Sequence, residues 1–225
     1  MNSRDAILSR IRAAQGRAGA PSAPETAAVA TYIAAHPSGP RPPSDWDPLQ
    51  RLRERALSLT TTLDEVADLA AVPAAVARYL RNNQLPLNAV CWAELAALDW
   101  TSAGLQIEAR ETHGNDLVGI TGAFCAIAET GTLMLPASPQ RPTTLNLLCD
   151  TEIVVLRASR VVGAMEEAWD MLRYEREGMV AGNFLPRNVM FVTGPSRSAD
   201  IESTLELGAH GPRRLHVVLI DDTAG

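Results

Sequence analysis

Residues 152–162 have the sequence EIVVLRASRVV and residues 216–220 have the sequence HVVLI. A strand that is covered on one face alternates apolar and polar side chains, whereas a strand buried on both faces loses this alternation. IVVL and HVVLI are continuous apolar runs of the second kind. They predict central strands of a parallel sheet that is covered on both faces.

The segments around these runs alternate between helical and strand patterns. Residues 125–129 (CAIAE) and 132–136 (TLMLP) predict a pair of strands that form a β-hairpin. Apolar residues at helical spacing predict helices over residues 48–57, 64–84 with a break at Pro73, 93–100 and 164–178. Short apolar runs predict further strands over residues 58–63, 87–92, 104–110, 188–194 and 213–221. This alternation is typical of an α/β fold with a mostly parallel sheet.

The first 45 residues have a different character. Ser3 can cap a short helix with an apolar stripe, and a second helical patch follows over residues 26–35. The Pro-rich residues 36–48 then predict an extended linker. We therefore expect an N-terminal helical extension with its linker over residues 1–45 and one α/β domain over residues 46–225.

The composition argues against several classes of function. The chain has 225 residues and a net charge of −6, which disfavours binding to nucleic acid or to an anionic membrane surface. Its three cysteines and four histidines lack the spacing of a metal or iron–sulfur site, so we expect no intrinsic metal or cofactor. No apolar run reaches the ~20 residues of a membrane span, and the N-terminus lacks the apolar run of a secretory signal. We expect a cytoplasmic protein.

The tetrapeptide E-T-G-T, residues 129–132, interrupts the apolar hairpin. Gly131 permits the positive φ of a tight turn, and an extended strand before it places Glu129 at the end of an apolar row. A carboxylate in apolar surroundings can have a raised pKa and serve as acid, base or nucleophile. The same residues also fit a solvated hairpin tip, and polar loop tips are common. The residues alone favour the hairpin tip.

The stretch FVTGPSRSADIE, residues 191–202, predicts a strand, a turn and a helix around residues 199–205 that Ser198 caps. The start of such a helix offers backbone N–H groups and a positive dipole end. Ser196 and Arg197 would add donors suited to phosphate or carboxylate. If the preceding strand is parallel, this turn lies at its carboxyl end, where α/β sheets bind ligands. A simple helix cap with a solvated arginine explains the residues equally well.

Two further stretches are weaker candidates. His210 lies between glycines at a predicted helix-to-strand junction, where Gly208 or Gly211 could end the helix. A histidine there could act near neutral pH, although a loop histidine bonded to backbone is the commoner case. Arg141 could close over an anion together with nearby threonines, but we interpret its segment as an ordinary surface loop.

Three stretches closely resemble the LUD-domain family, in its lactate utilization protein C (YkgG) type. The resembling stretches are GITGAFCAIAETGTLML (119–135), TEIVVL (151–156) and VTGPSRSADIESTLELGAHGPRRLHVVLIDD (192–222). The N-terminal SRDAILSRIRAA resembles the first helix of that family. The resemblance implies a Rossmann-like α/β sandwich of the NagB/RpiA/CoA-transferase type, which agrees with the alternation described above.

The resemblance also implies a role in bacterial oxidation of L-lactate to pyruvate. The chain would be a non-cluster accessory subunit that works with iron–sulfur partner proteins. The alternative is a stand-alone enzyme or a sensor that binds an anionic small molecule or acyl-CoA, with Glu129 as the catalytic carboxylate by analogy of fold. A homodimer is compatible with each of these functions.

The family motifs assign candidate site residues. Glu129 and His210 are the catalytic candidates. The expected ligand-binding residues are Thr130, Gly131, Thr132, Thr193, Gly194, Ser196, Arg197, Ser198, Asp200 and Gly211. We expect Glu129, the turn over residues 194–200 and His210 to converge in one cleft at the strand ends. Many relatives carry Pro and His where this chain has Cys149 and Glu152, a departure that affects activity or partner choice if that histidine belongs to a site.

Overall fold

The computed structural model describes residues 3–16, 20–176, 185–199 and 205–223, and the chain divides into two compact units, Met1–Pro43 and Ser44–Gly225. The first unit contains α1 (Ser3–Ala14) and α2 (Ala23–Ala35), and neither helix buries a side chain. The Ser22 side chain caps α2 in a reciprocal capping box with Glu25, so this helix begins before the predicted patch at residue 26. Within the described ranges, no helix is both long enough and apolar enough to cross a bilayer.

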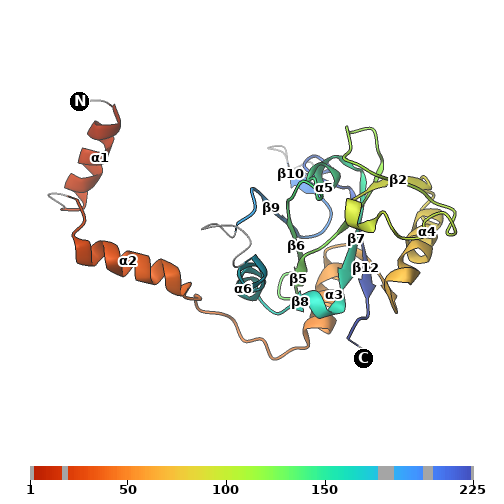
Figure 1. Ribbon diagram of the computed structural model, residues 1–225, viewed down its shortest axis with the longest axis horizontal. Coiled ribbons are helices and arrows are strands. Elements are labelled where there is room, and N and C mark those ends of the chain that lie inside the picture. Colours follow the sequence, from red (N-terminus) through yellow and green to blue (C-terminus); the bar gives the residue numbers. More distant parts are fainter. Residues whose placement is uncertain (1–2, 17–19, 177–184, 200–204, 224–225) are drawn as a thin grey trace. The chain divides into compact units, whose positions relative to one another are not determined.

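A six-stranded parallel sheet forms the centre of the second unit (Figure 1). In spatial order its strands are β1 (Thr62–Val66), β12 (Arg214–Ile220), β7 (Thr151–Arg157), β4 (Val118–Gly122), β2 (Asn88–Cys91) and β3 (Gln106–Ala109). The two unbroken apolar runs are β7 and β12, which pair side by side in the interior of this sheet. The prediction of an α/β fold with a mostly parallel sheet is confirmed.

Both faces of the six-stranded sheet are covered. Ile153 and Val155 of β7 belong to the core beneath α4 (Val72–Asn82), whereas Val154 and Leu156 belong to the core on the opposite face. In Figure 1, α4 lies on one side of this sheet and the elements β5, β6 and α6 lie on the other. Because alternate side chains of residues 153–156 enter two separate cores, each of these positions favours an apolar residue, which explains the lack of alternation.

A four-stranded sheet packs on the second face. In spatial order its strands are β8 (Val161–Val162), β5 (Cys125–Ile127), β6 (Thr132–Pro136) and β9 (Val189–Val192). The predicted hairpin is confirmed as the antiparallel pair β5–β6. Ala126 and Leu133 of this hairpin pack toward the six-stranded sheet, while Cys125 and Met134 pack toward α6 (Met165–Arg176).

The chain passes from one sheet to the other without a loop. Directly after β4, the Ala123 N–H donates to the Val155 carbonyl of the six-stranded sheet at 3.0 Å. The next residue, Phe124, donates its N–H to the Met134 carbonyl of the hairpin at 2.9 Å. The open end of the hairpin therefore lies beside the carboxyl end of β4, and the hairpin turn lies at the far end.

The helix predicted over residues 64–84 is confirmed after its break at Pro73 but wrong before it, and the helix predicted over residues 93–100 is wrong. Residues 64–66 complete β1, and α4 begins at Val72 after the 3₁₀ helix η1 (Leu69–Ala71). Pairing of these residues with β12 overrides their local helical pattern, and Arg78 of α4 pairs with Asp64 at 2.7 Å. Residues 93–100 form only the short 3₁₀ helix η2 (Ala93–Leu95), after which the chain folds back and the Trp100 indole N–H donates to the Leu95 carbonyl.

The helix predicted around residues 199–205 is also wrong where the structure describes it. Ser198 lies in strand β10 (Arg197–Ala199), which pairs antiparallel with β11 (Leu205–Leu207). The alternation Leu-Glu-Leu suits a strand, and a partner strand outweighs the local capping signal. Residues 200–204, including Asp200, lie outside the described residues. Consequently Gly208, with a φ of +83°, follows a strand and ends no helix.

Because all six central strands run in one direction, their sheet has an amino edge and a carboxyl edge. α3 (Pro48–Ser58) and residues 59–61 lead into β1 at the amino edge, and α5 (Thr144–Leu148) leads into β7 there. At the carboxyl edge, β7 continues into the 3₁₀ helix η3 (Ala158–Arg160). Candidate residues lie at both edges.

Candidate functional site

The E-T-G-T residues form the turn between β5 and β6. Gly131 has a φ of +73° and donates its N–H to the Ile127 carbonyl at 2.9 Å. A Cβ at Gly131 would lie 2.9 Å from the Cβ of Arg55 on α3, so only glycine lets the turn approach that helix so closely. The Thr130 and Thr132 hydroxyls lie 2.7 Å apart. The turn is therefore packed on its glycine side and polar on its threonine side.

The T-G-P-S residues follow β9 and meet this turn. The Thr193 hydroxyl lies 2.7 Å from that of Thr132, so the two motifs share a chain of three hydroxyl groups. Gly194 has a φ of +84°, and a Cβ there would lie 3.1 Å from the Cβ and carbonyl oxygen of Leu59. Both motif glycines thus pack against the segment that leads into β1 at the amino edge.

Ser196 connects the same region to the H-G-P residues. Its N–H donates to the Pro212 carbonyl at 2.8 Å, and its hydroxyl accepts the His210 N–H at 3.2 Å. A Cβ at Gly211 would lie 3.5 Å from the Ser196 Cβ. Arg197 donates to the Thr60 hydroxyl. These contacts gather three stretches of chain at the amino edge.

The two catalytic candidates are placed differently. Glu129 is half-buried at the hairpin turn, and the His210 side chain is exposed. Among the described residues, neither side chain has a hydrogen-bond or ion-pair partner, and no contact joins them. The structure thus brings the motif backbones together through Thr132–Thr193 and Ser196–His210 but shows no contact between the two reactive groups. Their catalytic roles stay predictions, and Asp200 lies outside the described residues.

A buried polar cluster lies next to these motifs. Glu152 has no exposed surface, and its Oε1 accepts from the Thr121 hydroxyl at 3.0 Å and from the Asn146 amide. Burial raises the pKa of Glu152 to about 7, against the lowering effect of both hydrogen bonds. Glu152 Oε2 and Asn146 Oδ1 have no partner among the described residues. The backbone carbonyl oxygen of Asn146 would lie 3.7 Å from a Cβ added at Gly211, which places the cluster beside the H-G-P residues.

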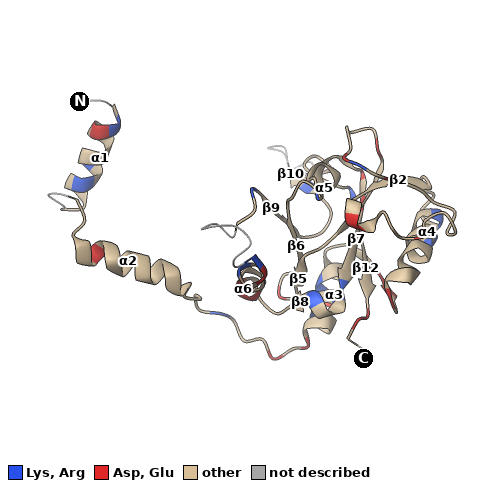
Figure 2. Ribbon diagram, in the orientation of Figure 1, with Lys and Arg blue, Asp and Glu red and all other residues tan. Residues whose placement is uncertain are grey.

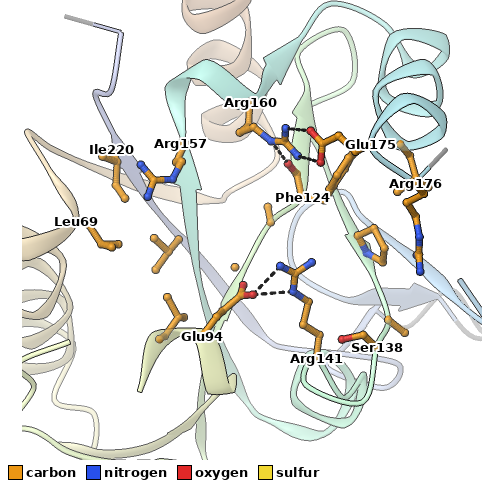
Figure 3. A pocket seen from close by; sticks show the side chains of 17 residues that line it. Leu69, Glu94, Phe124, Ser138, Arg141, Arg157, Arg160, Glu175, Arg176 and Ile220 are labelled. Atoms are coloured by element: carbon orange, nitrogen blue, oxygen red, sulfur yellow. Dashed lines mark hydrogen bonds and ion pairs between the residues drawn. The ribbon is translucent and has the colours of Figure 1, made fainter. Parts of the chain in front are cut away.

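A cavity of about 600 Å³ opens at the carboxyl edge of the central sheet (Figure 3). Its walls come from the ends of β4, β7 and β12 and from the open end of the hairpin. The lining residues are Leu69, Glu94, Leu95, Gly122, Ala123, Phe124, Pro136, Ala137, Ser138, Arg141, Val155, Arg157, Arg160, Leu172, Glu175, Arg176 and Ile220. None of the expected site residues that the structure describes lines it.

Charged groups around this cavity are partly paired. Arg141 contacts Glu94 at 2.6 and 2.8 Å, and the Arg160 guanidinium bonds Glu175 and the Phe124 carbonyl (Figure 3). Arg141 lies in a segment whose sequence is that of an ordinary surface loop. Arg160 lies within the stretch 152–162, shortly after the apolar run IVVL, and this position is a signal for a site at a strand end.

The described residues give little support for a metal centre. They contain no group of three or more His, Cys, Asp and Glu side chains that could hold a metal ion. Cys91, Cys125 and Cys149 are all buried, and burial raises their pKa values to about 11, 12 and 12. These thiols are therefore protonated near neutral pH and pack as small apolar groups.

A parallel six-stranded sheet with a second sheet packed on one face defines an α/β protein of the sandwich type. Residues 58–220 match the family model of the LUD domain. The chain belongs to the LUD-domain family.

Individual relatives agree with this assignment. The chain is 34% identical over 147 residues to lactate utilization protein C of Exiguobacterium, covering 65% of this chain and 62% of that protein. It is 42% identical over 102 residues to an uncharacterized protein of Neisseria meningitidis, covering 45% of this chain and 41% of that one. The alignments thus span roughly two fifths to three fifths of these curated relatives.

A solved structure shares the fold. The crystal structure of a DUF162 family protein from Deinococcus radiodurans superposes with a TM-score of 0.58 at 26% sequence identity. The match covers 80% of this chain and 99% of that chain.

Proposed function

We propose that this chain is a component of a bacterial L-lactate utilization system, in which lactate is oxidised to pyruvate. The observation that carries the proposal is the similarity to relatives named lactate utilization protein C, of which that of Bacillus subtilis is 36% identical over 105 residues. The family match over residues 58–220 supports it, because it includes the motifs that meet at the amino edge.

Within this system we assign the chain a non-cluster role beside iron–sulfur partner proteins. Its three cysteines are protonated and separated into different cores: Cys91 packs beneath α4, Cys149 lies on the opposite sheet face and Cys125 packs against α6. Thiols arranged in this way do not form a cluster ligand set, which needs several converging thiolates. The electrons released from lactate would therefore pass to a partner.

Growth of a deletion strain tests the proposal. Removing the gene should abolish growth on L-lactate as sole carbon source while growth on pyruvate continues, and the intact gene should restore it. Pull-down from lactate-grown cells should recover proteins that contain iron–sulfur clusters. Normal growth of the deletion strain on lactate would contradict the proposed function.

A second function, catalysis or sensing with Glu129 as the reactive carboxylate, is favoured by one observation. Glu129 is half-buried beside the three-hydroxyl chain and has no partner among the described residues, so its carboxylate is available to a ligand. Glu129→Gln keeps the shape and removes the charge. Complementation with this variant should fail if Glu129 reacts with an anionic substrate or acyl-CoA, and full lactate growth would eliminate this role.

A further inference from the structure

We propose that the carboxyl-edge cavity binds a phosphorylated small molecule of nucleotide size. This inference goes beyond the proposed function, because it concerns a site distant from the family motifs and a ligand larger and more highly charged than lactate. It rests on the position, the charge and the size of the cavity.

The position is the first argument. Open α/β sheets bind ligands outside the carboxyl ends of their strands. Gly122, Arg157 and Ile220 are the last residues of β4, β7 and β12, and all three line the cavity. The family motifs gather at the opposite edge, so the two places are separate.

The charge is the second argument. Among the described residues, the charged side chains that line the cavity are four arginines and two glutamates. Glu94 and Glu175 are already paired with Arg141 and Arg160. Arg157 has only a long contact of 3.6 Å to Asp222, a carboxylate that also accepts from the backbone and side chain of Ser159. Arg176 has no carboxylate partner among the described residues.

The excess of two guanidinium groups favours a doubly charged group. A phosphate monoester carries a charge of roughly −1.5 to −2 near neutral pH and offers three acceptor oxygens. Arginine is well suited to such groups because its planar guanidinium binds two oxygens at once. A monocarboxylate such as lactate would balance only one of the two charges.

The size is the third argument. The cavity volume of about 600 Å³ lies in the range of pockets that hold cofactor-sized ligands. Apolar side chains form the rest of the wall, including Leu95, Val155 and Ile220. The Arg160 guanidinium lies 4.4 Å from the ring centroid of Phe124 and pairs with Glu175, so this part of the cavity wall presents a cation beside an aromatic ring. A ligand that fills the cavity therefore needs an apolar or planar portion besides its phosphate.

Calorimetry on the full-length purified protein tests the inference, with ADP and inorganic phosphate as probes and L-lactate as the monocarboxylate. We expect ADP to bind more tightly than phosphate, and phosphate more tightly than lactate, with affinities that fall as salt is raised. Arg157→Gln and Arg176→Gln should each weaken ADP binding by about tenfold, because each removes one of the two guanidinium groups in excess and its charge-assisted hydrogen bonds. Circular dichroism verifies that each variant is folded.

Two matched variants make the test specific. Arg213→Gln removes the same charge from an exposed side chain at the amino edge, beside Asp150, and should leave ADP binding unchanged. Glu94→Gln removes the carboxylate that competes for Arg141 and should strengthen phosphate binding. The inference is overturned if neither ADP nor phosphate binds, if lactate binds more tightly than both, if Glu94→Gln weakens binding, or if Arg213→Gln weakens binding as much as Arg157→Gln. Because binding is measured without partners, failure here is distinct from failure of the proposed function.

Discussion

The Thr132 and Thr193 hydroxyls lie 2.7 Å apart and join two motifs that are separated by 61 positions in the chain. Thr132 is 3% exposed, whereas Thr130 and Thr193 at the two ends of the hydroxyl chain reach the surface. The Thr132 hydroxyl is thus a hydrogen-bond partner that water would otherwise supply to Thr130 and Thr193. Its contacts hold the hairpin turn against the residues that follow β9.

Replacing this middle hydroxyl should destabilise the protein. Thr132→Val preserves the side-chain shape but removes the hydrogen bonds to both neighbours, and we expect a loss of about 1–2 kcal/mol in the free energy of unfolding. Urea denaturation measures this loss. Thr144→Val is the control, because the Thr144 hydroxyl is buried without a partner among the described residues and its removal should be neutral or stabilising. Equal losses in both variants would show that the shared hydroxyl contributes nothing.

Adding a methyl group at the hairpin turn should also be costly. Gly131→Ala forces alanine into a φ of +73° and places its Cβ 2.9 Å from the Arg55 Cβ. Gly114→Ala is the matched control, since Gly114 has a φ of +89° but no atom within 4 Å of the added Cβ. We expect the control to lose about 1 kcal/mol from backbone strain and Gly131→Ala to lose about 1–3 kcal/mol more from overlap. Thermal and urea unfolding of both variants give the comparison.

Glu152 should make the protein less stable as pH rises. Its pKa is raised from 4.5 to about 7 in the folded state, so between these values the folded state binds more protons than the unfolded state. The protein therefore loses stability as pH increases through that window. Above the window, the total loss in the free energy of unfolding due to this group is on the order of 3 kcal/mol. Glu152→Gln, which resembles the neutral acid, should be more stable than the parent at about pH 8 and similar to it near the lower end of the window. A variant that is less stable at both pH values would contradict a buried carboxyl held near neutrality.

His216 should give stability the opposite pH dependence, so that the protein becomes less stable as pH falls. The histidine is 1% exposed, stacks on Tyr79 with ring centroids 3.8 Å apart, and its Nδ1 lies 2.8 Å from the Thr62 hydroxyl. Burial lowers its pKa from 6.5 to about 4, despite the Asp64 carboxylate at 3.9 Å. Below the unfolded value the unfolded state binds the extra proton, so stability is lost as pH falls from about 6.5 toward 4.

Nuclear magnetic resonance can follow this histidine directly. The ring signals of His216 should stay those of neutral imidazole down to about pH 5. In the Glu152→Gln background, unfolding experiments should show stability rising with pH between about 4 and 6.5. Protonation of His216 near its ordinary value would refute the prediction.

Much of the fold could be predicted because its strongest signals are local. The unbroken apolar runs of β7 and β12 and the Gly-containing turn between two apolar runs each reflect burial or backbone geometry within a few residues. The helix predictions for residues 64–66 and for Ser198 are wrong for the opposite reason. Residues 64–66 are in a strand because they pair with β12, more than a hundred residues away in the chain. Ser198 is in a strand because β10 pairs with β11, which follows residues 200–204.

The candidate site was harder to predict. Motif resemblance selected stretches of chain that contact one another at the amino edge through Thr132–Thr193 and Ser196–His210. The predicted convergence of the Glu129 and His210 side chains in one cleft stays a prediction. The carboxyl-edge cavity brings together Glu94, Arg141 and Arg160, which are isolated charges in the sequence. No periodic pattern links such residues, because only the order of strands in the sheet brings their loops to one place. The burial of Glu152 is equally hard to predict, since the sequence around a carboxylate beside an apolar run is the same whether its side chain is buried or exposed.

The β5–β6 hairpin reaches from one candidate place to the other. Its turn carries the E-T-G-T motif, and its open end supplies Phe124 and Pro136 to the cavity. A substitution in either strand of the hairpin can displace both its turn and its open end, because the two strands form one hydrogen-bonded pair. Mutational scans of hairpin positions will therefore mix effects on the motif residues with effects on the cavity. Arg157, on a different strand, offers a clean way to separate them.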